Sequence, residues 1–476
     1  MTALESYHEV LGNFAAMKRF NERWVADPSF RDAVTADPAA TLARYKIDCR
    51  PEDIKPPRSA DFADASLSMR AMWQIVRAKT RLVHELYREE ATPSDARMTA
   101  WRDREIARQM LDLGPFHTRS NIHSSLAFEL TKGCSVGCWF CALSPDRLTA
   151  VFRHDEENGA LWRDVLTAFK DAIGGAMKSG FLYWASDPLD NPDYEKFCLD
   201  FHDVAGIFPP TTTALALKNA ARTRALLRVS EEHGCWLNRF SIITLKMLDA
   251  VHREFSADEL ARVECLAVNR ESAFAFGNAG RFRDHANAEP EILDRQFQNL
   301  QWAPWYTGDP SYAGTEEYPL ASIGCVTGFL VNMCDRDVKL ISPCTADDRW
   351  PLGYFVYEEG TFETADDFRA LIAKMIETRM SPHVAPRARP AFHSWMRYEE
   401  IDNGFRLHGR FHGTATFRDA EIGNVWRATG DLVKDGASSA EEIVARVSSQ
   451  TGAEANLVER QLEGLRQSGV LDELQL

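Results

Sequence analysis

The sequence has no run of 18 or more apolar residues, so nothing in it is typical of a membrane-spanning helix. Its opening residues, MTALESYHEV, lack the basic and apolar regions of a secretory signal peptide. An excess of basic residues is missing as well, because 55 lysines and arginines face 70 aspartates and glutamates, a net charge of −15. This acidic balance argues against nucleic acid or an anionic membrane as the main partner. We therefore expect a cytoplasmic protein that binds neither.

No cysteine follows Cys344, although the chain has 10 cysteines in all. Without export signals, this number indicates metal and thiol chemistry in a reducing compartment rather than disulfides. At 476 residues the chain is too long for one ordinary core, so we expect two to four units.

The stretch LAFELTKGCSVGCWFCALS, residues 126–144, carries the strongest chemical signal. A short apolar run ends before Gly133 and predicts a buried strand that leads into a loop. Cys134, Cys138 and Cys141 follow on that loop, and three thiolates can hold three irons of a [4Fe–4S] cluster while the fourth iron stays open. A structural zinc site or three unrelated thiols are the alternatives. Zinc normally takes four ligands in two pairs, and no second pair follows nearby.

Short apolar segments alternate with helical segments from residue 121 to 345. This alternation predicts an α/β fold with a parallel sheet and reactive groups at the carboxyl ends of the strands. The rhythm alone does not separate a barrel from a doubly wound sheet. The expected strands are 126–130, 180–184, 212–217, 237–243 and 264–268, and the expected helices include 161–176 and 219–233.

The cysteine spacing, with Phe140 before the last cysteine, resembles the radical SAM superfamily. The resemblance implies a partial (β/α)₆ barrel, a [4Fe–4S] cluster on the three cysteines, S-adenosylmethionine on the open iron, and an electron donor of the flavodoxin or ferredoxin type. Where that superfamily usually has Gly-Gly-Glu, this chain has a stretch with Ser186 and Asp187, which could accept hydrogen bonds from the methionyl ammonium. A turn with helix-capping aspartates is the alternative. The implied cofactor-binding residues are Phe140, Ser186, Asp187, Arg239, Ser241 and Asn278.

Residues 325–344 predict a hairpin with its turn at Asp335-Arg336-Asp337. A four-cysteine auxiliary cluster from Cys265, Cys325, Cys334 and Cys344 is possible, but free thiols are the favoured interpretation. The run VKLISPCTADDRWPLGYFVYEEGTF, with SDPLDNPDYEKF and TTTALALK, resembles radical SAM peptide epimerases that mature proteusin-type peptides. In that family a cysteine supplies a hydrogen atom. The resemblance assigns this role to Cys344, which we expect at the barrel mouth, with Cys325 as second choice.

The two ends of the chain resemble peptide-recognition elements. ADPSFRDAVTADPAATLARYKI resembles the leaders of nitrile-hydratase-like precursor peptides, and a plain helical cap is the equal alternative. Residues 396–476 are similar to winged-helix-like leader-recognition domains, while His408 and His412 are more typical of surface or packing residues than of a metal site. The predicted units are a leader-like helical segment (1–60), a helical extension (61–120), the barrel with its hairpin (121–345), a helical bridging region (346–395) and the winged-helix-like domain (396–476).

Together these features predict an enzyme that epimerises residues in a precursor peptide carrying a leader. A 5′-deoxyadenosyl radical would remove the α-hydrogen of an L-residue, and a thiol on the opposite face would return a hydrogen atom. Alternatives are peptide crosslinking or excision, chemistry on a small molecule, or a binding protein with a degenerate barrel. The intact cysteine triplet argues against the last.

Overall fold

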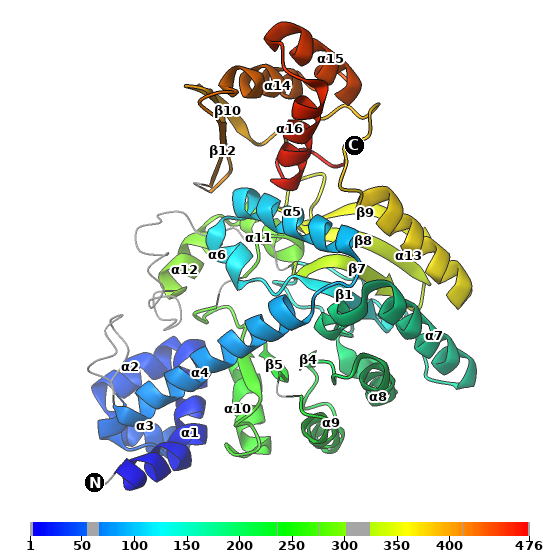
Figure 1. Ribbon diagram of the computed structural model, residues 1–476. Helices are drawn as coiled ribbons and strands as arrows, with labels where there is room; N and C mark the ends of the chain where they lie inside the picture. The colour runs from blue at the N-terminus through cyan, green and yellow to red at the C-terminus, as the bar shows by residue number, and fades with distance from the viewer. Residues whose placement is uncertain are drawn as a thin grey trace.

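The computed structural model describes residues 3–54, 66–235, 237–274, 276–300, 324–411 and 413–474. It is a mixed α/β structure in which helices surround the strands and a smaller unit projects from one side (Figure 1). Within these ranges no helix has the length and apolar character needed to cross a bilayer. His412 and residues 55–65 and 301–323, parts of four predicted units, lie outside the described residues.

The central sheet has the strand order β1-β7-β8-β9. Strand β1 pairs with β7 in parallel, and β7, β8 and β9 pair as antiparallel neighbours, which confirms the predicted hairpin. The turn closes because the Asn332 side chain accepts the backbone N–H groups of Cys334 (2.9 Å) and Asp335 (3.0 Å). Gly328 allows the close β1–β7 approach, since a Cβ there would overlap the carbonyl group of Ser125. The strands are β1 (Ser124–Glu129), β7 (Val326–Asn332), β8 (Asp337–Pro343) and β9 (Tyr354–Thr361).

The prediction of a helical region from residue 346 is wrong for its first part. Residues Tyr354–Thr361 form the fourth strand of the central sheet, and helix α13 (Ala365–Arg379) begins only after it. The segment YFVYEEGT is rich in aromatic residues and alternates buried with less buried positions, as expected of an edge strand.

The central sheet has two different faces. The outer face carries Leu126, Phe128 and Phe329, and α7 (Glu156–Ile173) and α13 cover it to form the largest core. The inner face carries Ala127, Leu330 and Ile341. These residues pack with Phe181 and Trp184 from the segment that follows α7.

A second sheet of three short parallel strands, β4-β5-β6, confirms the predicted β-α alternation. The expected strand at 212–217 shortens to two residues because other groups bind its backbone: the Asp187 carboxylate accepts the Ala214 N–H (2.7 Å), and Thr213 Oγ1 accepts the Leu215 N–H (2.9 Å). The expected strand at 180–184 contributes one parallel bridge, Phe181 to Ala127. Among the described residues the strands fall into separate sheets and do not make one continuous barrel. The (β/α)₆ barrel therefore stays a prediction. The elements are β4 (Thr212–Thr213), β5 (Arg239–Ile242), β6 (Glu264–Ala267), α8 (Tyr194–Ala205), α9 (Ala220–Glu232), α10 (Leu245–Glu254), α11 (Gly280–Ala288) and α12 (Glu291–Leu300).

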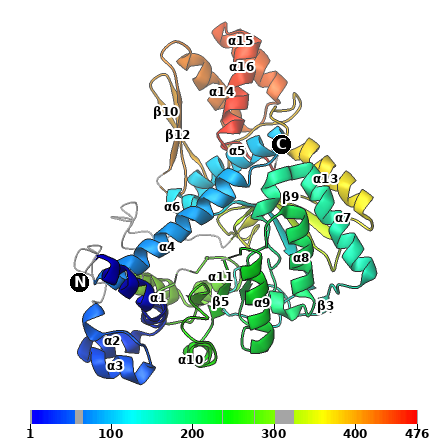
Figure 2. The same cartoon turned by 60° about the horizontal axis from the view of Figure 1, so that its bottom comes forward.

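The amino-terminal helices form part of the body. Two Asp-Pro pairs begin helices here, since Asp27 caps the helix that begins at Pro28 and Asp37 caps the next. Phe30 and Leu42 are buried in a core shared with α10 and β6, so the leader-like segment is packed helix here. In Figures 1 and 2 the long α4 runs from these helices toward α5. The helices are α1 (Ala3–Ala26), α2 (Pro28–Ala36), α3 (Pro38–Tyr45), α4 (Leu67–Glu85), α5 (Ala96–Asp112) and α6 (Pro115–Ser120).

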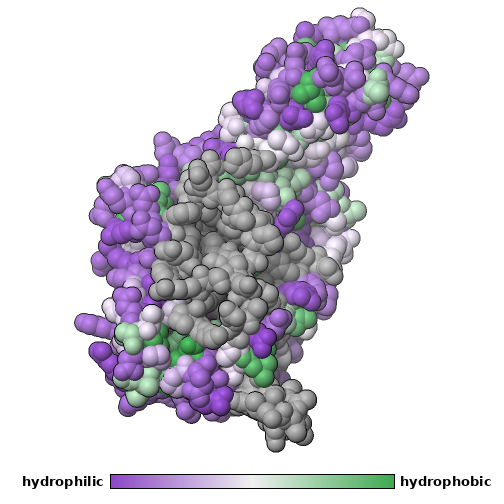
Figure 3. Space-filling view, turned by 90° about the vertical axis from the view of Figure 1, so that its left-hand side faces the viewer, coloured by the Kyte–Doolittle hydropathy of each residue, from purple (hydrophilic) through white to green (hydrophobic). Residues whose placement is uncertain are grey.

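The carboxy-terminal unit consists of a three-stranded antiparallel meander followed by three helices. A capping box formed by Ser439 and Glu442 begins the second of these helices. The strands precede the helices, so the winged-helix comparison stays a prediction. In Figure 3 the unit projects from the rest of the molecule, and its visible surface is mostly hydrophilic. Its elements are β10 (Arg397–Ile401), β11 (Gly404–His408), β12 (Thr414–Arg418), α14 (Gly423–Asp435), α15 (Ala440–Thr451) and α16 (Ala455–Gln467).

Candidate metal centre and the buried network around it

The loop with Cys134, Cys138 and Cys141 follows the carboxyl end of β1. It passes from β2 (Thr131–Lys132) to β3 (Ala150–Val151), which pair with each other and close its base. Gly133 has φ 84°, and a Cβ there would overlap the backbone of Arg147, so the loop closes only with glycine at this position. The Cys134 N–H donates to the Asp146 carbonyl oxygen at 3.0 Å. The backbone therefore holds the three cysteines on one tight loop.

The three thiols are electrostatic neighbours. Burial raises the pKa of Cys138 to about 12, and the nearby Cys141 and Cys134 add to this rise. Burial also raises the pKa of Cys134, while the backbone N–H groups of Val136 and Gly137 bond to its sulfur and oppose the rise. Those N–H groups stabilise a thiolate, which is the form that binds metal. The three thiols are thus close enough to interact electrostatically, and their binding of a metal cluster stays a prediction.

Helix α11 fixes the far side of the cysteine loop. The Arg281 backbone N–H donates to Ser144 Oγ at 2.6 Å and to the Cys141 carbonyl oxygen at 3.1 Å. Gly280 has φ 50°, and a Cβ there would overlap the Ala142 carbonyl group. Gly280 therefore allows the backbone at the start of α11 to approach the cysteine loop closely.

Two predicted cofactor residues flank this contact. The Phe140 ring lies 4.9 Å from the Phe276 ring, in a small apolar cluster with α11. The Asn278 side-chain oxygen is buried and has no hydrogen-bond partner among the described residues. Ser186 makes no hydrogen bond within the same set. Asn278 therefore offers an acceptor beside the loop that a ligand could use.

Asp187 and Asp190, which follow residues 180–184, accept hydrogen bonds from neighbouring segments. Asp187 binds β4 and the residue after it, and Asp190 binds the cysteine loop. Asp187 accepts hydrogen bonds from Thr213 Oγ1 and from the Ala214 N–H, both at 2.7 Å, and burial raises its pKa to about 6. Asp190 accepts the backbone N–H (2.9 Å) and hydroxyl (2.6 Å) of Ser135, inside the cysteine loop. The turn-and-cap alternative is thus observed, and a role for Asp187 toward an ammonium group stays a prediction.

Arg239 lies at the other end of the strands. It is the first residue of β5, where its guanidinium binds Glu264 of β6 at 2.8 Å, and Lys79 of α4 binds the same carboxylate at 2.7 Å. Arg239 is thus held by Glu264 at the amino end of β5, and a role in cofactor binding stays a prediction. Ser241 lies two residues farther along β5, on the same face and nearer the carboxyl end.

Cys325 lies just before β7, at the amino end of the sheet, where its carbonyl oxygen accepts the Ser124 N–H at 2.8 Å. Its side chain packs on the inner face with Tyr183 and Tyr354, and burial raises the pKa of its thiol to about 12 while Arg239 opposes the rise. Cys334 lies beyond the other end of β7, roughly 23 Å away for a seven-residue strand. The two thiols cannot share one cluster, which rules out the four-cysteine auxiliary cluster.

Cys344 does not lie where we predicted it. Strand β8 runs antiparallel to β7: Ile341 pairs with Gly328, and Val326 pairs with Ser124, the first residue of β1. The carboxyl end of β8 therefore lies at the amino end of β1, opposite the cysteine loop. Cys344 is buried in the outer-face core, and burial raises the pKa of its thiol well above its usual value.

Sequence reasoning missed a pair of polar residues at the carboxyl ends of β1 and β7. Alternation places Glu129 on the inner face with Ala127, and Asn332 with Leu330. Asn332 Nδ2 donates to Glu129 Oε2 at 2.7 Å, and the Ala185 N–H donates to Oε1 at 3.1 Å. Burial raises the pKa of Glu129. The signal was available, since Glu129 is the charged residue inside the apolar run LAFEL.

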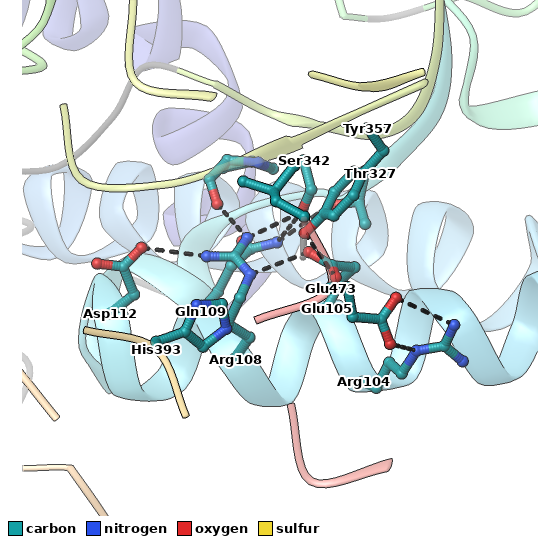
Figure 4. A network of polar contacts seen from close by, with 12 residues as sticks. Arg104, Glu105, Arg108, Gln109, Asp112, Thr327, Ser342, Tyr357, His393 and Glu473 are labelled. Carbon is teal, nitrogen blue, oxygen red and sulfur yellow. Dashed lines mark hydrogen bonds and ion pairs between the residues drawn. The ribbon is translucent and has the colours of Figure 1, made fainter. Parts of the chain in front are cut away.

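A buried charge network joins α5 to the central sheet and to the carboxy-terminal unit (Figure 4). Arg108 is 1% exposed and binds Glu105 at 3.0 Å, Asp112 at 3.1 Å and Ser342 Oγ at 3.0 Å. Arg410 of the carboxy-terminal unit binds the second Asp112 oxygen at 3.1 Å. Through α5, the unit and the sheet therefore share one set of buried charges.

His393 lies in this network and predicts a pH effect on stability. It stacks on Trp395 (5.1 Å between ring centres), and burial, with Arg108 and Arg410 nearby, lowers its pKa to about 3 from 6.5. Below pH 6.5 the unfolded histidine takes up a proton that the folded one does not, so stability falls as pH falls. Between pH 6.5 and about 5 this costs roughly 2 kcal/mol. As pH is lowered, the denaturation midpoint of His393→Phe should fall less steeply than that of the wild-type chain. An unchanged slope would contradict the assignment.

The fold and the loop together define a mixed α/β protein with a candidate three-cysteine metal centre at the carboxyl end of a buried strand. No protein-family model matches the chain. "Uncharacterized protein y4wI" of Sinorhizobium fredii (strain NBRC 101917 / NGR234) is 32% identical over 469 residues, which cover 96% of this chain and 87% of y4wI. The chain therefore belongs to the same family as y4wI.

Among solved structures, the crystal structure of BtrN in complex with AdoMet and 2-DOIA aligns with 53% of this chain and 86% of BtrN. The identity is 13% and the TM-score is 0.29.

Proposed function

We propose that this chain is a radical SAM enzyme that converts L- to D-residues in a ribosomally made precursor peptide. The observation that carries the proposal is the cysteine loop: three neighbouring thiols at the carboxyl end of a buried strand, with the loop bound by Asp190 and α11. This donor set fits a [4Fe–4S] cluster with one open iron, and the buried, unpaired Asn278 oxygen beside it fits a bound cofactor. When bound, the cluster and S-adenosylmethionine supply a 5′-deoxyadenosyl radical that removes an α-hydrogen.

The inner face offers groups that suit a peptide substrate. Glu129 and Asn332 form a buried polar pair in a mainly apolar surface, and such a pair can orient the amide groups of an extended peptide. Lys339 and Asp337 lie next to Asn332 along the hairpin, with the charged groups 3.3 Å apart. These residues would bind and orient the peptide.

Hydrogen return requires a thiol on the side of the sheet where the peptide lies. Cys325 packs on the inner face and its thiol stays protonated at neutral pH, as a hydrogen donor must. Cys344, our first choice from the sequence, lies under the outer-face core. Both thiols lie at the amino end of the central sheet, away from the cysteine loop, so the face on which it packs is what favours Cys325 over Cys344 as the donor.

The carboxy-terminal unit would bind the precursor's leader. Strands β10 and β12 are the edge strands of its meander, and an edge strand can pair with an extended peptide. Deleting this unit is a poor test, because Glu473 binds the buried Arg104 of α5 (Nε to Oε1, 2.5 Å). A single proline in β12, at Thr416, would disturb the edge with fewer side effects.

The test is co-expression, in deuterated water, with a candidate precursor peptide that carries a nitrile-hydratase-like leader. Epimerisation adds about one dalton per converted residue and changes nothing else in the peptide, because the returned hydrogen comes from an exchangeable thiol. Cys325→Ala should still cleave S-adenosylmethionine but release little D-residue, and Cys344→Ala is the matched control. New crosslinks or cleaved peptide would instead support the crosslinking or excision alternative. An unmodified peptide would overturn the proposal.

A further inference from the structure

A second cluster of metal-binding side chains lies away from the cysteine loop. Glu22 of α1, His252 of α10 and Cys265 of β6 place one ligand atom each within 4.8 Å of one another. His252 Nε2 lies 3.0 Å from Glu22 Oε2. The three residues come from separate parts of the chain and meet where the amino-terminal helices pack on the second sheet.

We propose that Glu22, His252 and Cys265 form a zinc site. A carboxylate oxygen, an imidazole nitrogen and a thiolate sulfur are the three ligand types that zinc combines in proteins. Three protein ligands fill three of the four positions of tetrahedral zinc and leave one for water. The zinc would replace the proton shared by His252 and Glu22 and the proton of the Cys265 thiol, so binding releases protons.

The surroundings of Glu22 fit a metal-ligating carboxylate. Lys18, one helical turn earlier on α1, binds Oε1 and leaves Oε2 to face His252. Ligating carboxylates are commonly held in this way by a partner outside the metal's own ligands. Glu22 is 7% exposed and the His252 side chain 13%, so the cluster is screened from bulk water but near the surface.

Two nearby cations oppose the metal charge, one bound to a proposed ligand and one bound outside the cluster. Lys18 binds the Glu22 carboxylate, and Arg19 donates to the Phe255 carbonyl oxygen at 2.7 Å. Glu22 and a Cys265 thiolate would together offset the charge of one Zn²⁺. The second sheet would thereby be tied to α1 by metal as well as by apolar packing.

The test measures zinc by mass spectrometry in the full chain carrying Cys134→Ser, Cys138→Ser and Cys141→Ser, which removes the competing thiols of the loop. After loading with zinc and desalting, about one zinc per chain should remain. Adding Cys265→Ser or His252→Ala should bring the content near zero. Cys49→Ser is the matched control, because Cys49 packs against the same core without joining the cluster, and it should keep the zinc.

Cobalt gives a second readout that needs no further substitution. Cobalt in place of zinc should show the near-ultraviolet band of a thiolate ligand, and the band should survive Cys49→Ser. A parent chain without bound zinc or without this band would overturn the proposal, as would equal zinc in Cys265→Ser. Because the three cysteines of the loop are replaced in this background, the result is independent of the proposed epimerase function.

Discussion

Arg108→Ala is expected to lower the free energy of unfolding by about 3–5 kcal/mol, because it leaves the buried Glu105 with an uncompensated charge and leaves Asp112 with Arg410 as its remaining cationic partner. Arg108 also binds Ser342 and lies 4.6 Å above the Phe355 ring, so the substitution removes contacts between α5 and two strands. Chemical denaturation and thermal unfolding both measure the effect.

Arg97→Ala is the matched control for this prediction. Arg97 lies on the same helix and also binds an aspartate, Asp95, but its side chain is 47% exposed. We expect a change of about 0.5 kcal/mol or less, since water already solvates this pair. Similar losses of unfolding free energy in the two variants would contradict the view that burial determines how strongly the Arg108 network stabilises the fold.

Replacing Cys134, Cys138 and Cys141 together by alanine should abolish iron binding. Anaerobic reconstitution of the wild-type chain should give about four irons, and the triple variant none. Cleavage of S-adenosylmethionine should fall below detection, because the open iron that would bind it is lost. Iron determination and product chromatography make the measurement.

Cys334→Ala is the control for iron binding, because Cys334 lies in the β7–β8 turn and takes no part in the loop. It should keep the full iron content and the visible absorbance of the cluster. Full iron in the triple variant would assign the metal to other residues.

The sequence was informative where one local feature decides the structure. The cysteine loop, the hairpin turn, the two Asp-Pro caps and the Ser439 capping box depend on neighbouring residues, and the structure has all of them. The incorrect predictions concern the direction in which a strand runs and the end of the sheet at which a residue lies. SPC marks the end of a strand correctly, but whether that end lies near the cysteine loop depends on the antiparallel pairing of β8 with β7. Arg239 was placed inside a longer strand, and the structure begins β5 at this residue.

Sequence reasoning could not identify Glu22, His252 and Cys265 as one cluster, because their proximity also depends on how distant segments pack. They are separated by 230 and 13 residues along the chain (252 − 22 and 265 − 252), and no spacing rule connects them. Only the packing of α1 on α10 and β6 brings them together.

The parallel pairing of β1 with β7 has a consequence for synthesis of the chain. Residue 124 pairs with residue 326, so about 200 residues must be added before β1 finds this neighbour. At about 5–20 residues per second, the ribosome needs roughly 10–40 seconds for that length. During this interval α7 can cover the outer face of β1 and Phe181 can bridge to it, but the β7 edge of β1 stays unpaired and open to aggregation and to chaperones. The cysteine loop extends from β1, so the strand that carries it completes its sheet pairing only after the hairpin has been made.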